Sequence, residues 1–371
     1  MQVSELTALN AQVLIAAFVL SVIFGAITQR THFCTMGAVS DVINMGDWTR
    51  MRQWGLAIGV AMVGFALLAY LGVIDPGKTL HASSRWLWLS AAVGGGLFGF
   101  GMVLASGCGS KTLVRVGGGS LKSLVVMLVM GFAGFATMKG LTAVLRVATV
   151  DQVGVEFSTI ANLPHLAAAA MGTPPLLMTL VLGLLIGGAL IVWALVGSEF
   201  CRFDNLLGGL GIGAVIVAMW WLSGHLGFVA EHPETLEEVF LATNSGRAEA
   251  LSFVAPIAYT LDWLMFFSDK SKTLTIGIVS VIGVIAGSAL MALLTRSFRW
   301  EGFGSTEDLA NHLVGATLMG VGGVTAMGCT IGQGLSGIST LGATSFVAVC
   351  AILAGAVAAF KYQMWRLERM I

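Results

Sequence analysis

The sequence predicts an all-α polytopic membrane protein with about nine transmembrane helices, short re-entrant helices and two pseudo-symmetric, inverted halves. Three observations predict this fold class. Hydrophobic residues make up 57% of the 371 residues and charged residues only 10%, with a mean hydropathy of +0.90, which excludes an ordinary soluble domain. Nine apolar runs are long enough to cross a bilayer as helices. A glycine-rich segment that ends in cysteine occurs twice.

The apolar runs define the membrane-spanning segments. Backbone polar groups cannot stay unpaired in lipid, so runs of this length must be helical. The first run is predicted to be a retained span, because the N-terminus lacks the basic region of a signal peptide and no small-residue cleavage site follows. The predicted spans are residues 11–29, 54–74, 87–106, 121–140, 175–197, 206–223, 274–295, 309–328 and 344–362.

The positive charges predict the sidedness of the chain. Arg30, Arg50 and Arg52 mark the link between the first two spans as cytoplasmic, since basic residues accumulate on that side. The N-terminus then lies outside. Two polar inserts, residues 141–173 and 225–250, carry few positive charges and are predicted to be external.

Residues 251–268 leave two topologies open. Pro256 and Asp262 interrupt an apolar run of marginal length. If this run does not cross, the protein has nine spans and its basic C-terminus lies inside; if it crosses, there are ten spans and the C-terminus lies outside. The charge bias favours nine spans.

The repeated segment is the most informative feature of the chain. Residues Val93–Cys108 (VGGGLFGFGMVLASGC) and Val314–Cys329 (VGATLMGVGGVTAMGC) are identical at nine of sixteen positions, and 221 residues separate both their first and their last members. With nine spans the two copies run in opposite directions. Inverted repeats of this kind are typical of secondary transporters, whose binding sites form near the membrane midplane from broken helices.

The repeat also suggests how the single membrane domain, residues 1–371, is divided. Residues 1–173 form the first predicted half, and residues 174–371 form the second, with the polar insert 225–250 within it. The glycine-rich stretches that follow the two cysteines, Gly107–Gly119 and Gly328–Gly342, are predicted to be the short re-entrant segments.

The cysteines at the ends of the repeats are the main candidates for function. Cys108 lies between Gly107 and Gly109, and Cys329 follows Gly328. Glycine permits a break, and a broken helix presents unpaired N–H groups that attract anions. A thiol is a weak donor with a soft sulfur, which suits a sulfur-bearing anion.

The remaining cysteines are weighed against the tendency of cysteine to pack as a small buried hydrophobe. Cys350, in the middle of an apolar run, fits such packing, and Cys201 is assigned to the same structural class. Cys34, just past the first span, is either a third thiol on the same path or a packing residue.

Polar residues near the two cysteines are candidate anion ligands. Lys111 and Arg115 follow Cys108 and either attract the anion or are ordinary cytoplasmic-end charges. Thr330 and Gln333 follow Cys329 and either hydrogen-bond an oxyanion or cap helix ends.

Several kinds of function receive no support from the sequence. The net charge of zero does not favour a nucleic-acid partner. The five cysteines are far apart and no two of the six histidines stand at metal-ligand spacing, so no metal, cofactor or catalytic residue is predicted. GxGxxG-like strings are expected by chance among 49 glycines and do not indicate a nucleotide site.

The cysteine segments resemble a known family. The strings ASGCGSKTLVRVGGGSLKSL and AMGCTIGQGLSGISTL, with FCTMGAVSD near the N-terminus, are similar to the YeeE/YedE family of bacterial inner-membrane sulfur-transport proteins. The resemblance implies an hourglass-shaped helical protein that takes up thiosulfate, passed between cysteines on its axis, often beside a small TusA-like sulfur carrier on the cytoplasmic side. Carried over by motif, the cysteines are Cys34, Cys108 and Cys329, the last two being the stronger matches.

Three hypotheses follow. The leading one is a transporter in the lipid bilayer for thiosulfate or a related sulfur anion, whose terminal sulfur accepts S–H contacts from the cysteines in turn. The alternative is a membrane-bound sulfurtransferase that forms a cysteine persulfide and passes sulfur to a carrier protein. The third is a non-catalytic scaffold whose cysteines only pack.

Overall fold

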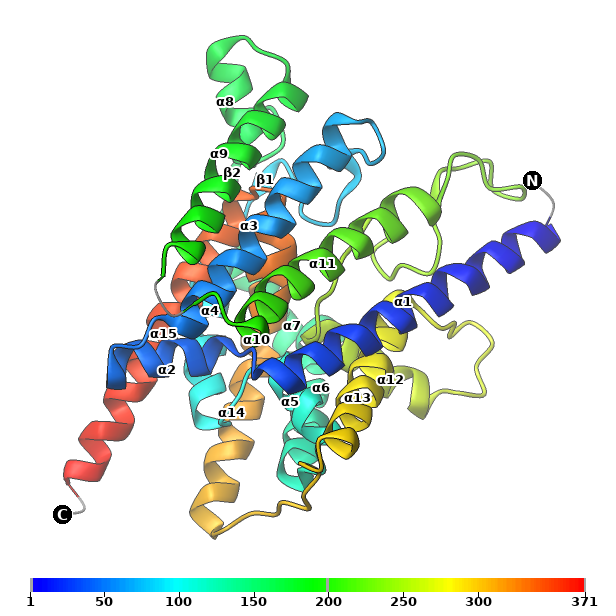
Figure 1. The fold of residues 1–371 in the computed structure, drawn as a ribbon. Helices are drawn as coiled ribbons and strands as arrows, with labels where there is room; N and C mark the ends of the chain where they lie inside the picture. The colour runs from blue at the N-terminus through cyan, green and yellow to red at the C-terminus, as the bar shows by residue number, and fades with distance from the viewer. Residues whose placement is uncertain (1–2, 198–199, 370–371) are drawn as a thin grey trace.

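The computed structural model describes residues 3–197 and 200–369, which are mostly helical (Figure 1). The helices are α1 (Val3–Thr31), α2 (Thr35–Met45), α3 (Thr49–Tyr70), α4 (Trp88–Leu104), α5 (Gly109–Gly117), α6 (Leu121–Lys139), α7 (Leu141–Ala148), α8 (Leu163–Met171), α9 (Pro175–Leu195), α10 (Phe203–Leu206), α11 (Ile212–Trp221), α12 (Val254–Met265), α13 (Ile276–Leu294), α14 (Thr306–Thr325) and α15 (Ala343–Glu368). Short 3₁₀ turns are η1 (Pro76–Lys78) and η2 (Val150–Gln152), and π-helical turns are η3 (Leu207–Gly211), η4 (Leu222–Leu226) and η5 (Gly332–Gly337).

The strands are confined to two small antiparallel ladders. Strand β1 (Arg85–Trp86) pairs with β2 (Val155–Glu156), and β3 (Phe228–Val229) pairs with β4 (Val239–Phe240). Both ladders lie in the inserts between long helices. An isolated bridge from Thr79 to Ala248 also ties the link after α3 to the insert after η4. The all-α prediction is therefore confirmed, with the inserts held together by backbone pairing.

The predicted spans agree closely with the long helices. Within the described residues, eight helical segments are long and apolar enough to cross a membrane, and they match eight of the nine predicted spans. The ninth, residues 309–328, corresponds to α14, a helix of 20 residues that is not among those eight. Its first turns carry Glu307, Asp308, Asn311 and His312, which lower its hydropathy. Helix α14 packs against α4 and α6 in the interior.

Helix α12 bears on the topology left open by the sequence. It has 12 residues, which at helical rise span about 18 Å, too short to cross a hydrocarbon core of about 30 Å. Asp262 near its end pairs with Lys272 in the following loop. The run 251–268 therefore forms a half-length helix, and the nine-span topology fits the structure.

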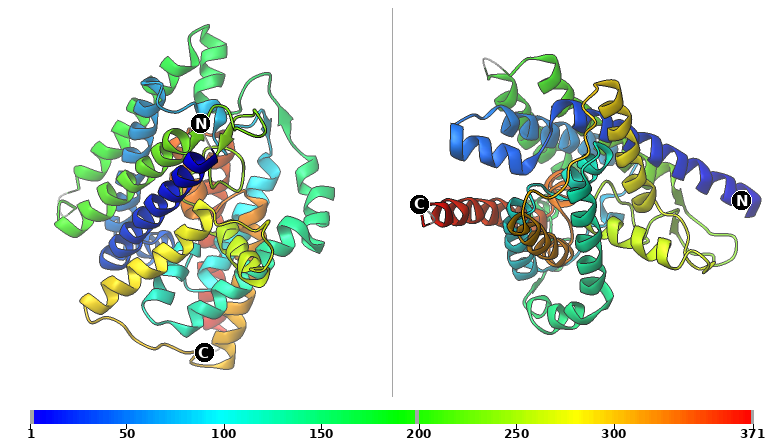
Figure 2. Two further views of the ribbon diagram at one scale, coloured as in Figure 1. Left: turned by 90° about the vertical axis from the view of Figure 1, so that its right-hand side faces the viewer. Right: turned by 90° about the horizontal axis from the view of Figure 1, so that it is seen from below.

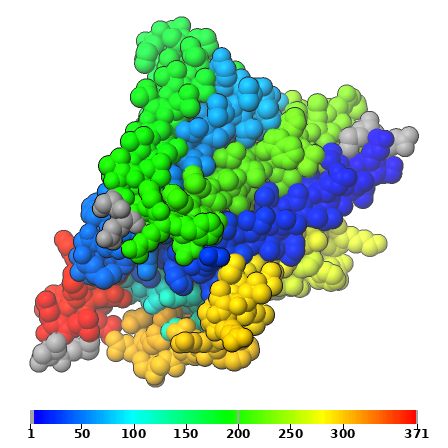
Figure 3. All heavy atoms as spheres, viewed as in Figure 1, coloured from blue at the N-terminus to red at the C-terminus, as the bar shows by residue number. Residues whose placement is uncertain are grey.

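The long helices form two layers (Figures 1 and 2). Helices α4, α6, α14 and α15 pack together on one side, and α1, α3, α9, α11 and α13 cover them on the other. Figure 3 views the second layer from outside, where α9, α3, α11 and α1 lie closely side by side. The short helices α2, α5 and α12 fit between the layers.

Helices α4 and α14 cross in opposite directions through paired glycines. A Cβ on Gly94 would lie 2.7 Å from the carbonyl oxygen of Gly322, and one on Gly101 would lie 2.6 Å from that of Gly315. In the repeat, Gly94 corresponds to Gly315 and Gly101 to Gly322, so the two contacts are equivalent under exchange of the halves. Such self-matching contacts are the mark of a two-fold relation. Residue numbers rise along α4 in the direction in which they fall along α14, so the two helices are antiparallel. The repeat is therefore inverted, as predicted.

The neighbours of this pair follow the same relation. Helix α15 packs on α4, and in the same way α6 packs on α14. The short helix α2 packs on α3 and α15. The short helix α12 correspondingly packs on α13 and α6. The inverted arrangement therefore extends beyond the repeated segment. The division of the chain at residues 173 and 174 stays a prediction.

Candidate functional site

Three helices break in the same way immediately before a cysteine. His32, Ser106 and Met327 adopt left-handed backbone conformations with φ of 53°, 57° and 57°, and each lies two residues before a cysteine. After Ser106 and Met327 the N–H groups of Gly107 and Gly328 bond back to the carbonyls of Met102 and Gly323, both at 2.8 Å. Such bonds close the C-terminus of a helix.

Each cysteine then begins the next helix. Cys34 caps α2, Cys108 caps α5, and Cys329 precedes the helical segment 330–339 that contains η5. The glycine-rich stretches after Cys108 and Cys329 thus form short helices, as predicted. All three cysteines are free thiols, and their exposed fractions are 5% or less.

Cys34 and Cys108 lie against each other. Their thiols are near neighbours, although 74 residues separate the two cysteines in the chain. The sulfur of Cys34 also accepts the N–H of Gly37 at 3.4 Å, and the sulfur of Cys108 lies 3.3 Å from the hydroxyl of Ser110. Each sulfur therefore lies at the N-terminus of its own short helix.

Backbone N–H groups surround the sulfur of Cys329. The N–H of Gly332 approaches its sulfur at 3.5 Å, and the N–H groups of Ile331 and Phe253 also face it. Phe253 is the N-cap of α12, so a second helix N-terminus points at this sulfur. Backbone N–H groups that converge in this way form an anion-binding concavity.

Thr330 is a neighbour of both Cys108 and Cys329. Its side chain lies beside the sulfur of Cys108, and its chain neighbour is Cys329. Its hydroxyl makes no well-aligned hydrogen bond within the described part of the chain, and the residue is only 2% exposed. The close approach to Cys108 is therefore a contact rather than a strong hydrogen bond. An unsatisfied buried hydroxyl is costly, which indicates a donor held for an incoming ligand.

The N-termini of four short helices face this centre. Helices α2 and α5 face it with Cys34 and Cys108, and α12 and the segment 330–339 face it with Cys329. Each N-terminus carries about half a positive charge. An anion at the centre would be stabilised from both sides without any fixed counter-ion.

A basic cavity of about 330 Å³ lies on the side of Cys34. Lys111 and Arg115 line it, as does Arg50, whose guanidinium also pairs with Asp41 at 3.1 Å. Arg115 donates to the carbonyl of Ser106 at 2.6 Å and so supports the break. Among the described residues, the side chain of Lys111 makes no hydrogen bond or ion pair, which leaves its ammonium group available. The full lining is His32, Cys34, Met36, Gly37, Arg50, Ser106, Lys111 and Arg115.

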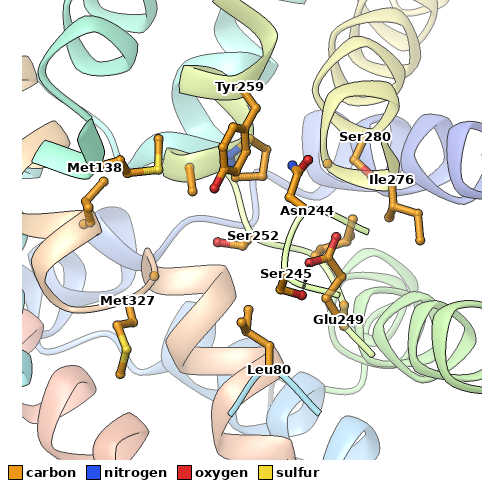
Figure 4. A pocket seen from close by; sticks show the side chains of 18 residues that line it. Leu80, Met138, Asn244, Ser245, Glu249, Ser252, Tyr259, Ile276, Ser280 and Met327 are labelled. Atoms are coloured by element: carbon orange, nitrogen blue, oxygen red, sulfur yellow. Dashed lines mark hydrogen bonds between the residues drawn. The ribbon is translucent and has the colours of Figure 1, made fainter. Parts of the chain in front are cut away.

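A second cavity, of about 220 Å³, lies on the side of Cys329 (Figure 4). Met327 and Gly328 of the break line it, and so do Leu251 and Ser252, which lead to Phe253. Figure 4 shows Met138 and Met327 on one side and Asn244, Ser245 and Glu249 on the other. Cys34 therefore lines the basic cavity, and Cys108 and Cys329 are buried between this cavity and the second, largely apolar one.

The remaining predicted site residues support the breaks. A Cβ on Gly107 would lie 3.3 Å from Cγ of Lys111, and one on Gly328 would lie 3.0 Å from Cγ of Gln333. At Gly109, a Cβ would be in ordinary contact with Phe253 at 3.7 Å.

Gln333 holds the second break in place. It donates to the carbonyl of Ala326 at 2.7 Å and accepts from Ser345 at 2.6 Å. Both ends of its amide are thus engaged within the protein.

The other two cysteines differ from their sequence interpretation. Cys350 and Cys201 were expected to pack inside the protein, but both are exposed. Cys350 lies on α15, where an apolar run in a membrane helix gives no sign of which face meets lipid. Cys201 contacts the carbonyl of Leu195 at a sulfur to oxygen distance of 3.7 Å.

Two contributors to the site are not among the predicted site residues. The sequence marks Arg50 only as a cytoplasmic charge, because nothing local shows that it reaches the side of Cys34. Phe253 carries no polar side chain, and its contribution is a backbone N–H. Within the described residues, no group of three His, Cys, Asp or Glu side chains could hold a metal ion.

The chain is similar in sequence to known transporters. The chain is 27% identical to "Thiosulfate transporter TsuA" of Spirochaeta thermophila over 336 residues, 88% of this chain and 92% of that protein. It is 26% identical to "Thiosulfate transporter TsuA" of Escherichia coli over 339 residues, 87% of this chain and 86% of that protein. A shorter match, 32% identity over 111 residues, covers 30% of this chain and 26% of "Probable transporter YedE" of Escherichia coli.

The family comparison covers most of the chain. The sulphur transport family matches residues 30–358, which include all three helix breaks and both cavities. This multi-pass membrane protein therefore belongs to the sulphur transport family, the YeeE/YedE family that its cysteine segments resemble.

Proposed function

We propose that the protein transports thiosulfate across the bacterial inner membrane and that the anion passes between Cys329, Cys108 and Cys34. The observation that carries the proposal is the convergence of three broken helices, each with a buried thiol at its break, between two cavities. The names of the two long relatives support the same substrate.

Each part of the anion has a partner in this arrangement. The terminal sulfur is soft and accepts S–H contacts from the thiols. The oxygen-bearing end is stabilised by helix N-termini and by the free hydroxyl of Thr330. Gln333, Gly107 and Gly328 act by holding the breaks in position. No bond of the anion is broken along this path.

The charge of the basic cavity, called the inner cavity from here on, favours release of the anion toward the cytoplasm. Lys111, Arg115 and Arg50 attract the dianion from the buried cysteines. The cavity of about 330 Å³ that these residues line gives the dianion room to leave. We place this cavity on the cytoplasmic side by the positive-inside bias. A TusA-like sulfur carrier is the proposed protein partner on that side.

The decisive experiment uses thiosulfate labelled on both sulfur atoms and liposomes that contain only this protein. Intact transport brings both labels inside in equal amounts. The sulfurtransferase alternative instead leaves the sulfonate sulfur outside as sulfite, and the transporter names of the relatives do not favour it. Unequal uptake of the two labels would therefore overturn the proposal.

Cysteine variants test the path itself. Cys108→Ser and Cys329→Ser keep a hydroxyl donor but lose the soft sulfur, and we expect uptake to fall by roughly tenfold or more, the effect of losing about 1.4 kcal/mol. Cys350→Ser is the matched control, because that thiol is exposed on α15 and should leave uptake unchanged. Normal uptake by both buried variants would contradict the path.

A further inference from the structure

Glu249 is an acidic residue that borders the path of a dianion. It lines the cavity of about 220 Å³ on the side of Cys329, called the outer cavity from here on, together with Leu251 and Ser252. The same segment continues to Phe253, whose N–H faces the sulfur of Cys329. Asn244 and Ser245 at the rim are exposed, so the cavity communicates with the surface. An anion that approaches Cys329 through this cavity therefore enters a space whose wall carries the carboxyl group.

The position of Glu249 is fixed by hydrogen bonds. Its backbone N–H donates to the hydroxyl of Ser223 at 2.8 Å, and that hydroxyl donates to its carbonyl at 2.6 Å. Its carboxyl oxygen accepts from the hydroxyl of Ser245 at 3.0 Å, as Figure 4 shows. The carboxyl group is thus held at the cavity wall.

The charged groups of the surrounding elements do not neutralise Glu249. On its own segment, Arg247 donates to the carbonyl of Ala82. On the loop after α3, Lys78 pairs with Glu238, and His81 packs on Trp220 with its pKa lowered by burial to about 4. On α12, Asp262 pairs with Lys272, and Tyr259 has a raised pKa because of burial, Glu249 and Asp262. The residues of α13 that line the cavity, Ile276, Gly277 and Ser280, are not titratable.

The lining of the same cavity also offers a hydrogen-bond donor. Ser280 is 1% exposed, and its hydroxyl has no partner among the described residues. A buried donor without a partner indicates that the cavity accepts an oxygen-bearing guest. The cavity therefore combines a donor suited to an anion with a carboxyl group that, when ionised, would repel it.

We propose that Glu249 controls entry of the anion: the outer cavity admits the dianion when the carboxyl group of Glu249 is protonated and excludes it when that group is ionised. This inference rests on the proposed function. Burial without a cationic partner raises the pKa of Glu249 to about 7, which brings the switch into the physiological range. Uptake should accordingly be high below this pKa and fall as pH rises through it.

The test measures initial uptake of labelled thiosulfate into liposomes with equal pH on both sides, so that no proton gradient drives the flux. Thiosulfate itself stays a dianion from pH 6 to pH 8. For the wild type we expect a fall of about tenfold across this range, which is the change in the protonated fraction of a group with pKa about 7.

Three variants isolate the carboxyl group. Glu249→Gln keeps an acceptor for Ser245 but cannot ionise, so its uptake should vary less than about twofold and exceed that of the wild type at pH 8. Glu249→Asp keeps an ionisable group and should retain the fall. Glu234→Gln, on the exposed loop of the same insert, is the control and should behave as the wild type does.

The outcomes separate this inference from the proposed function. If the wild type takes up no thiosulfate, the proposed function fails. If the wild type transports but Glu249→Gln keeps the wild-type pH profile, the entry role is wrong. Loss of uptake at every pH in a Glu249→Gln protein that remains folded also overturns it, because a neutral side chain should permit entry.

Discussion

At the scale of single residues, the site is built from groups whose hydrogen-bonding capacity is left unused. The thiols of Cys34, Cys108 and Cys329 are buried, yet only weak contacts involve their sulfur atoms. Lys111 lines the inner cavity, and no carboxylate among the described residues pairs with its ammonium group. A protein interior normally satisfies its polar groups, so exceptions gathered at one place mark the part of the molecule that a ligand completes.

Thr330 permits a test of this view in which stability and function change in opposite directions. Thr330→Val removes a hydroxyl with no well-aligned partner, so it relieves a cost of about 1–3 kcal/mol and loses a ligand donor. We expect an unfolding temperature in detergent at least as high as that of the wild type, together with slower thiosulfate uptake.

Thr137 provides the matched control on α6. Its buried hydroxyl donates to the carbonyl of Ala133 at 2.7 Å, far from the cysteines in the chain. Thr137→Val should therefore lower the unfolding temperature, by the loss of about 1 kcal/mol, and leave uptake by the folded protein unchanged. If both variants lose stability equally, the hydroxyl of Thr330 serves the fold and not the anion.

At the scale of elements, the site depends on how closely α4 and α14 approach each other. Glycine at the crossing brings the two backbones together, as small residues do between membrane helices. The same two helices end at the breaks before Cys108 and Cys329. Their separation therefore sets the distance between the two parts of the sulfur path.

Two glycines on α4 make this dependence measurable. At Gly101 a Cβ would lie 2.6 Å from the carbonyl oxygen of Gly315 and 2.9 Å from the N–H nitrogen of Met319, neither of which can rotate away. We expect Gly101→Ala to destabilise the protein by about 1–3 kcal/mol and to reduce uptake. The unfolding temperature in detergent and liposome uptake report the two effects.

Gly96, on the same helix, supplies the comparison. A Cβ there meets nothing within 4 Å, so Gly96→Ala adds a methyl group without overpacking. Its unfolding temperature and uptake should match or exceed those of the wild type, because alanine favours helix more than glycine does. Equal loss in both variants would show that α4 is sensitive to any change and that the crossing has no special role.

At the scale of the whole molecule, sequence reasoning succeeded where the information is local or repeated. Apolar runs predict the spans because lipid leaves no other way to satisfy the backbone. The matched positions of Gly94, Gly101, Gly315 and Gly322 predict two equivalent segments, and the nine-span count predicts that these segments run in opposite directions. Interruption by Pro256 and Asp262 correctly raised doubt about a span at α12.

Other features depend on packing between distant segments and could not be read from the sequence. The approach of Cys34 to Cys108 joins two breaks from different spans, and no pattern links them. The N–H of Phe253 reaches Cys329 only because α12 begins at the centre. Glu249 looks like one more acidic residue of an external insert until the cavity beside it is seen.

The direction in which each span crosses the membrane follows from the same whole-molecule arrangement and is directly testable. In the nine-span topology α12 enters and returns on the outer side, so the loops before and after it lie outside. If α12 crossed instead, every later segment would change sides. A residue before α12, one after it and one between α13 and α14 therefore distinguish the two topologies completely.

Single cysteines placed in a Cys201→Ser, Cys350→Ser background, which removes the two exposed thiols, make this measurement possible. We expect a membrane-impermeant maleimide to label Glu234→Cys and Lys270→Cys in spheroplasts. Gly302→Cys, where a side chain meets nothing within 4 Å, should react only after the membrane is permeabilised. A ten-span protein would give the reverse for the last two positions: protection at residue 270 and labelling at residue 302. That result would place Cys108 and Cys329 in helices that no longer oppose each other, and the inverted path would have to be abandoned.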